Sequence, residues 1–111
     1  MAFDEELAQR VRDLLAAERG LTEARMFGGL AFLIHGNMAV SASGQGGLLL
    51  RVDPAQGSEL ARRPHAQLAV MRGREMDGWL RVDAEGVRTK RQLEQWVGRG
   101  VAYARTLPPK K

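Results

Sequence analysis

The hydrophobic pattern of the first third of the chain predicts one helix and one fully buried strand. Apolar residues recur at one-face helical spacing from residue 7 to residue 15, after Asp4 as a cap and before Gly20 as a stop. The next apolar run, 30–34, is unbroken, which is typical of a strand covered on both faces. We therefore expect a strand over 25–34 at the centre of a sheet.

Short, glycine-rich connections join this strand to two more, predicted at 38–43 and 48–52. Gly28-Gly29 would let the backbone bulge or pass close to a neighbour. Gly36-Asn37 suits the positive φ angles of a tight hairpin turn. Because the connections are too short for a crossover, the three strands are expected to form an antiparallel meander.

The second half predicts a short helix, two strands and a long helix. Asp53-Pro54 has the pattern of a cap and a first helical residue, and that helix must end before Pro64. Strands are expected at 67–71 and 79–83, with Asp77-Gly78 as a break before the second. The fold class is thus α+β, with a curved antiparallel sheet and the element order α-β-β-β-α-β-β-α.

The last helix has the clearest signals. Thr89 and Gln92 match a capping box, and Pro108-Pro109 ends the helix. Its apolar stripe consists of Leu93, Trp96, Val97, Gly100, Val101, Ala104 and Leu107. Since glycine weakens a helix by about 1 kcal/mol relative to alanine, Gly100 indicates a close approach of the helix backbone to the sheet.

Composition limits the classes of protein that need to be considered. At 111 residues the chain is one domain, 1–111, able to bury a core. The absence of cysteine excludes disulfides, thiolate catalysis and cysteine-ligated metals. An acidic N-terminus and the lack of any membrane-length apolar run predict a cytoplasmic protein that does not contact the membrane.

The positive charge is concentrated at one end of the chain. The formal net charge is +4, of which residues 88–111 contribute +6 and residues 1–87 contribute −2. The charge is therefore a property of the last helix and tail rather than of the whole surface.

Motifs for catalysis or cofactor binding are lacking. His35 and His65 have no carboxylates at ligand spacing, so a metal is not expected. No serine lies in a nucleophile elbow, and the glycines of 44–47 precede a strand instead of a phosphate-binding helix. We expect no cofactor, no metal and no enzymatic activity.

Two short blocks, 26–38 and 73–79, stand at a characteristic distance and carry a family resemblance. With 49–52 between them and 96–110 after them, the chain resembles the N-terminal domain of the TfoX/Sxy family over about residues 20 to 110. The structural signature residues are Met26, Phe27, Gly28, Gly29, Gly36, Asn37, Gly73, Met76 and Gly78.

The resemblance implies an α+β domain with helices packed on a curved antiparallel sheet, and a link to bacterial competence regulation. Longer relatives carry a second, helical domain, and this chain is expected to be a stand-alone version of the first. The family supplies no catalytic residues to transfer.

Arginines are the candidate binding residues. Arg51, Arg72, Arg74 and Arg81 lie on or beside predicted strands and could gather on one face to bind an anion or a partner. Acidic residues are interleaved with them, and this favours ordinary surface ion pairs. Arg91 and Arg99 give the last helix a basic outer face. Nucleic-acid binding there is not favoured, because no aromatic residues interleave for base stacking.

Three hypotheses follow. The first is a non-enzymatic regulatory or interaction module that works through contacts with an unidentified protein, as a homodimer because three helices leave much of a sheet uncovered. The second is weak binding of nucleic acid or a phosphorylated ligand through the basic helix or the sheet arginines. The third is a small enzyme of unrecognised type.

Overall fold

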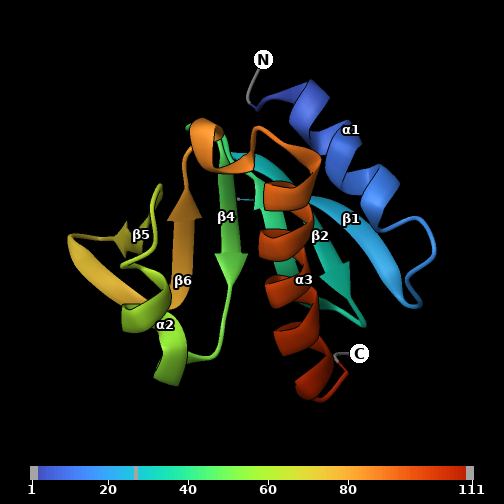
Figure 1. Ribbon diagram of the computed structural model, residues 1–111. Helices are drawn as coiled ribbons and strands as arrows, with labels where there is room; N and C mark the ends of the chain where they lie inside the picture. Colours follow the sequence, from blue (N-terminus) through green and yellow to red (C-terminus); the bar gives the residue numbers. More distant parts are fainter. Residues whose placement is uncertain (1–2, 27, 110–111) are drawn as a thin grey trace.

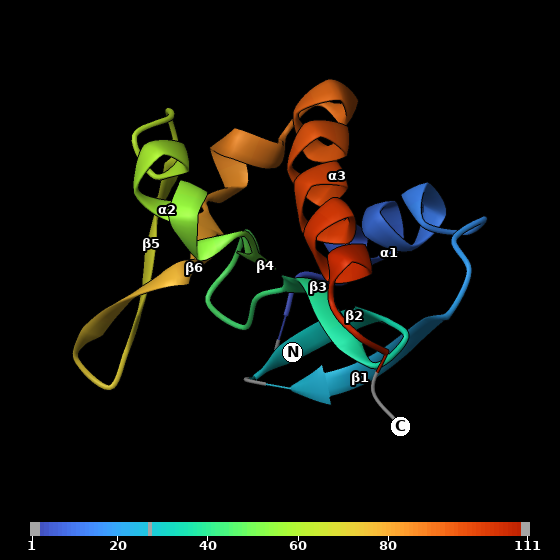
Figure 2. The ribbon, with the colours of Figure 1, turned by 90° about the horizontal axis from the view of Figure 1, so that it is seen from below.

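One antiparallel sheet with helices on a single side makes up the computed structural model, which describes residues 3–26 and 28–109 (Figures 1 and 2). In these residues the sheet has six strands in the order β1-β2-β3-β4-β6-β5. The helices are α1 (Glu5–Leu14), α2 (Pro54–Leu60) and α3 (Lys90–Thr106), with a 3₁₀ turn at Ala84–Val87. The strands are β1 (Leu21–Met26), β2 (Gly29–Ile34), β3 (Asn37–Ala42), β4 (Leu48–Arg51), β5 (Ala66–Met71) and β6 (Arg74–Val82). Phe27, Lys110 and Lys111 lie outside the described residues.

The predicted fold class is confirmed, with one strand more than the sequence pattern indicated. The strand expected over 25–34 is divided into β1 and β2, which pair antiparallel from Leu21 opposite Ile34 to Met26 opposite Gly29. Gly28 has a φ of +75°, a conformation that favours glycine, so the chain reverses here. The expected close approach is also present, because a Cβ on Gly29 would collide with the carbonyl oxygen of Ala42.

The hairpin between β2 and β3 differs from the prediction by one residue. His35 and Gly36 take the positive φ values, 50° and 84°, whereas Asn37 was expected to take one of them. Asn37 is instead the first residue of β3 and is 3% exposed. Its side-chain amide donates a hydrogen bond of 2.9 Å to the carbonyl oxygen of Pro108. This bond joins the start of β3 to the segment after α3.

Strand β6 is longer than predicted, because Asp77-Gly78, expected as a break before the strand, lies within it. The pairing with β5 jumps from Leu80 opposite Leu68 to Met76 opposite Ala69, so three residues of β6 are looped out on that side. On its other side β6 stays attached, since the amide of Val52 donates a 2.9 Å hydrogen bond to the Gly78 carbonyl. The break is therefore a bulge inside one strand.

The main core lies between the sheet and the helices. Phe32, Leu50 and Leu80 are fully buried on the helix side of the sheet and belong to one cluster with Trp96 of α3. The capping box of Thr89 and Gln92 starts α3 as predicted. Most of the predicted stripe is buried, namely Leu93, Trp96, Val97, Gly100, Val101 and Ala104.

Candidate functional site

We call the side of the sheet that carries none of the described helices the helix-free face. This face also has buried apolar side chains. Ala31, Met38, Leu49 and Ala69 form a second buried cluster, separate from the main core. The cluster is covered by the side chains of Met26, Leu33, Met71 and Trp79, which are themselves only half-buried. An apolar surface of methionine, leucine and tryptophan is typical of adaptable binding sites.

Strand register places three of the predicted arginines on the helix-free face. Residues directly opposite one another across a ladder share a face. Arg81 pairs with Leu49, Arg74 pairs with Met71, and both partners belong to the apolar cluster of that face. Arg51 follows Leu49 by two positions on β4 and lies opposite Trp79, so it shares the same face.

One of the acidic residues interleaved with these arginines, Glu75, does not share their face. Glu75 lies between Arg74 and Met76 on β6 and therefore points to the opposite face. The ion pairs among the described residues are Arg12–Glu23, Arg88–Glu85, Arg105–Glu18 and His65–Asp83. The sequence pattern favoured surface ion pairing for Arg51, Arg74 and Arg81, and in the described part of the chain they make none.

Arg51 is held by aromatic rings. Its guanidinium carbon lies 5.5 Å from the centroid of Trp79 and 5.8 Å from that of Tyr103 on α3. These distances allow cation–π attraction. By register Arg51 shares the helix-free face, but its guanidinium group also approaches a ring of α3, so the positive charge lies at the end of β4, at the border between the two sides of the sheet.

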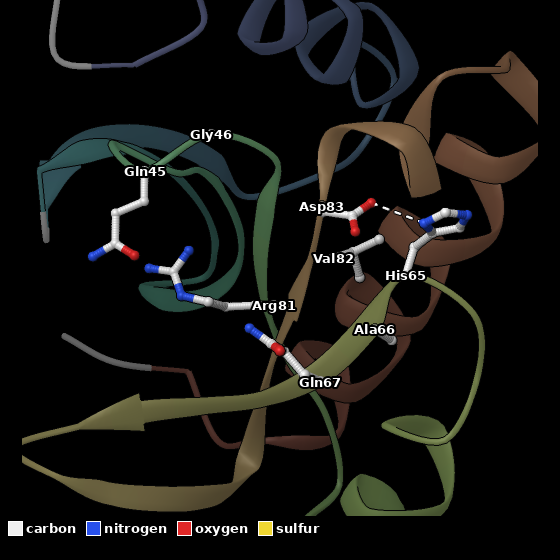
Figure 3. A pocket seen from close by; sticks show the side chains of 8 residues that line it. All are labelled: Gln45, Gly46, His65, Ala66, Gln67, Arg81, Val82 and Asp83. Carbon is white, nitrogen blue, oxygen red and sulfur yellow. Dashed lines mark ion pairs between the residues drawn. The ribbon is translucent and has the colours of Figure 1, made fainter.

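Arg81 lies in a cavity at the other end of that face (Figure 3). Its Nη1 donates a hydrogen bond of 3.0 Å to Ser43 Oγ, which also accepts a 3.1 Å bond from the Gln45 amide. In Figure 3 the side-chain amides of Gln45 and Gln67 lie on either side of the guanidinium group. The β3–β4 loop thus contributes directly to the environment of a β6 side chain.

The other candidate arginines are dispersed. Arg72 is exposed in the β5–β6 turn, and Arg91 is exposed on α3. Arg99 lies over the Trp96 ring at 4.7 Å, and burial, then the nearby charge of Arg63, lowers its pKa. Since Arg105 is paired with Glu18 at 2.6 Å, the outer face of α3 is not an open row of basic side chains.

The two histidines are exposed, as the sequence indicated, and they lie far apart in sequence on separate loops. His65 Nδ1 is 3.2 Å from Asp83 Oδ1, an oxygen that also accepts a 3.1 Å bond from the Gly86 amide. Across residues 3–26 and 28–109, no group of three or more His, Asp or Glu side chains could hold a metal ion.

The structural signature residues mark turns and packing positions. Gly28, Gly36 and Gly73 lie in three of the four hairpin connections of the described strands, and Gly78 lies in the β6 bulge. Met26 and Met76 are half-buried on β1 and β6. The sequence analysis did not identify two features of the site, namely the glutamines that line the cavity of Arg81 and the second apolar cluster. Strand parity could have found the cluster, because Leu49, Trp79 and Arg81 alternate with core residues.

The fold and site define a small α+β domain with an apolar, arginine-bearing sheet face. The chain belongs to the TfoX N-terminal domain family, whose model matches residues 13–104. This family is not a known enzyme family. No curated protein and no solved structure matches the chain. Among the described residues, no helix combines the length and the apolar character that crossing a membrane requires.

Proposed function

We propose that this chain is a non-enzymatic regulatory module that binds a protein through its helix-free face, in a cytoplasmic role linked to competence or transcription. The observation that carries the proposal is the half-buried apolar layer of Met26, Leu33, Met71 and Trp79 on a sheet side without described helices. A partner could bury the apolar surface of such a layer without a large rearrangement of the domain.

Charge complementarity indicates the kind of partner. Arg51, Arg74 and Arg81 lie on this face by register, and Glu75 points away from it. A partner surface that combines apolar side chains with acidic ones would complement both properties of the face. The family's link to competence makes a regulatory protein the expected source of that surface.

A second copy of the chain is a poorer occupant of this face. In a two-fold dimer the same patch meets itself, so the arginines of one subunit would lie against those of the other. The homodimer expected from the sequence would therefore use another surface, such as the open edge of β1. Light scattering at micromolar concentration tests it, and a monomer mass would contradict self-association.

Neighbouring residues of β5 provide a matched test of the helix-free face. Met71 packs on the apolar cluster, whereas Val70 points to the opposite side and is 60% exposed. The wild-type chain, Met71→Glu and Val70→Glu serve as baits in a native lysate, and the captured protein is then purified and titrated. We expect Met71→Glu to abolish binding and Val70→Glu to retain it. The proposal fails if Met71→Glu folds and binds as well as wild type.

A further inference from the structure

A cavity of about 310 Å³ lies between the β3–β4 loop and the paired strands β5 and β6. Arg81, Gln45 and Gln67 line one end of it, and His65 and Asp83 line the other (Figure 3). This volume is at the lower end of the range for small-molecule sites. The protein-binding proposal uses Arg81 only as one of three positive charges on the helix-free face and does not use the cavity itself, whose chemistry is polar rather than apolar.

The guanidinium group of Arg81 has unused hydrogen-bonding capacity at this position. A guanidinium carries five N–H donors, and the described residues supply one acceptor, Ser43 Oγ. Arg12 and Arg105, in contrast, each reach a carboxylate, at 2.7 and 2.6 Å. Arg81 is half-buried, and among the described residues no side-chain nitrogen is both buried and without a partner, so the remaining donors of Arg81 are open to the cavity and available to a ligand.

We propose that this cavity binds the carboxylate group of a small organic acid, with Arg81 as its principal contact. The fork of a guanidinium matches the two oxygens of a carboxylate in a bidentate arrangement. Gln45 and Gln67 line the same cavity. The Gln67 amide can donate a hydrogen bond to a carboxylate oxygen, and Gln45, whose amide oxygen faces the guanidinium group in Figure 3, can do so once its amide group is rotated by half a turn.

The charges of the cavity favour a monoanion over a phosphate dianion. Arg81 is the one arginine that lines it, and Asp83 at the far end contributes a negative charge. That carboxylate is engaged through Oδ1 with His65 and the Gly86 amide, so it does not neutralise Arg81. A monocarboxylate matches the single charge of Arg81, whereas a dianion leaves one negative charge unmatched and is repelled more strongly by the Asp83 carboxylate.

The test is a titration of the purified chain with sodium acetate, followed by ¹H–¹⁵N correlation spectra. Sodium phosphate and sodium chloride are added in parallel at the same ionic strength. We expect saturable acetate-dependent shifts at the Arg81 Nε–H and at the backbone amides of Gly46 and Gln67. Chloride should give no saturable shift, and phosphate should bind more weakly than acetate.

Three variants assign the effect to the guanidinium fork. Arg81→Lys keeps the charge but loses the fork, and should weaken acetate binding about tenfold. Arg74→Gln, on the same strand but at the exposed hairpin end, should bind acetate as wild type does. Gln67→Glu places an internal carboxylate beside Arg81 and should abolish acetate binding while the chain remains fully folded. This variant tests the proposal even if the Arg81 variants misfold.

Several results would overturn the proposal. One is an equal response to chloride and acetate, which would indicate ionic strength alone. A second is tighter binding of phosphate than of acetate. A third is undiminished acetate binding in folded Arg81→Lys or in Gln67→Glu. None of these measurements needs a protein partner, so failure here leaves the proposed role of the helix-free face untouched.

Discussion

Replacing Gly100 by alanine tests how closely α3 approaches the sheet. A Cβ at this position would lie 2.5 Å from the carbonyl oxygen of Ala39 and 2.8 Å from Val40 Cγ1. The backbone oxygen cannot move without disturbing β3, so the methyl group should cost about 1–3 kcal/mol in overpacking. Alanine recovers about 1 kcal/mol of helix propensity. We expect a net loss of up to about 2 kcal/mol.

The same helix supplies the control. A Cβ on Gly98 would have no heavy atom within 4 Å beyond its immediate chain neighbours and the helix backbone. Gly98→Ala should therefore show the propensity gain alone, a stabilisation of about 1 kcal/mol. Because both substitutions are chemically identical, the difference between the two variants isolates the steric contact with β3.

Thermal unfolding followed by circular dichroism measures this difference. For a domain of this size, 1 kcal/mol changes the melting temperature by about 4 °C. Gly98→Ala should melt about 4 °C above wild type, and Gly100→Ala should melt about 4–12 °C below Gly98→Ala. Equal increases for both variants would refute the close packing of α3 on β3.

Three further predictions address the core, an ion pair and nucleic acid. Trp96→Ala should lower the unfolding free energy by about 3–5 kcal/mol in urea titrations, since the indole is buried; a wild-type midpoint would contradict the assigned helix face. The hydrogen bond from Arg12 lowers the pKa of Glu23 in the folded protein. The pair therefore stabilises the fold at pH values above the ordinary glutamate pKa, and this stabilisation is lost as the pH falls through the lowered pKa of the folded state. Glu23→Gln should thus reduce the melting temperature at neutral pH but not below both pKa values, and a loss that persists in acid would exclude this cause. Duplex DNA at about 150 mM salt should show no sequence-specific binding in fluorescence anisotropy, and the salt dependence should be the same for Arg91→Ala and Arg99→Ala as for wild type. A sub-micromolar, sequence-dependent complex that the double variant loses would promote the nucleic-acid hypothesis.

Local signals predicted the elements whose ends are fixed by neighbouring residues. Thr89 with Gln92, Asp53 with Pro54, and the apolar stripe of α3 each form within a few residues, so sequence patterns contain them fully. The β6 bulge depends instead on contacts made from two different strands, because Gly78 bonds to Val52 while Leu68 and Ala69 skip it. Such pairing is not visible in a local pattern.

The candidate site was predictable in composition but not in arrangement. The arginines at 51, 72, 74 and 81 were identified as a group, and the strand register, including the jump at the β6 bulge, explains why those at 51, 74 and 81 share a face. Alternation alone separates Arg74 from its neighbour Glu75, but placing Arg74 and Arg81 on one face required knowledge of the register. Gln45 and Gln67 line the cavity of Arg81 from a loop and from another strand, and nothing in their own neighbourhoods distinguishes them from ordinary surface glutamines.

The bulge in β6 also affects solubility. Strand β5 is an outer strand of the sheet, and its Val70 is a large apolar side chain that is 60% exposed. A long, flat edge with such a residue would be a template for intermolecular strand addition and aggregation. The register jump between Leu68 and Ala69 divides the β5 ladder into two short parts and increases its local twist. The irregularity therefore protects this edge from pairing with another chain.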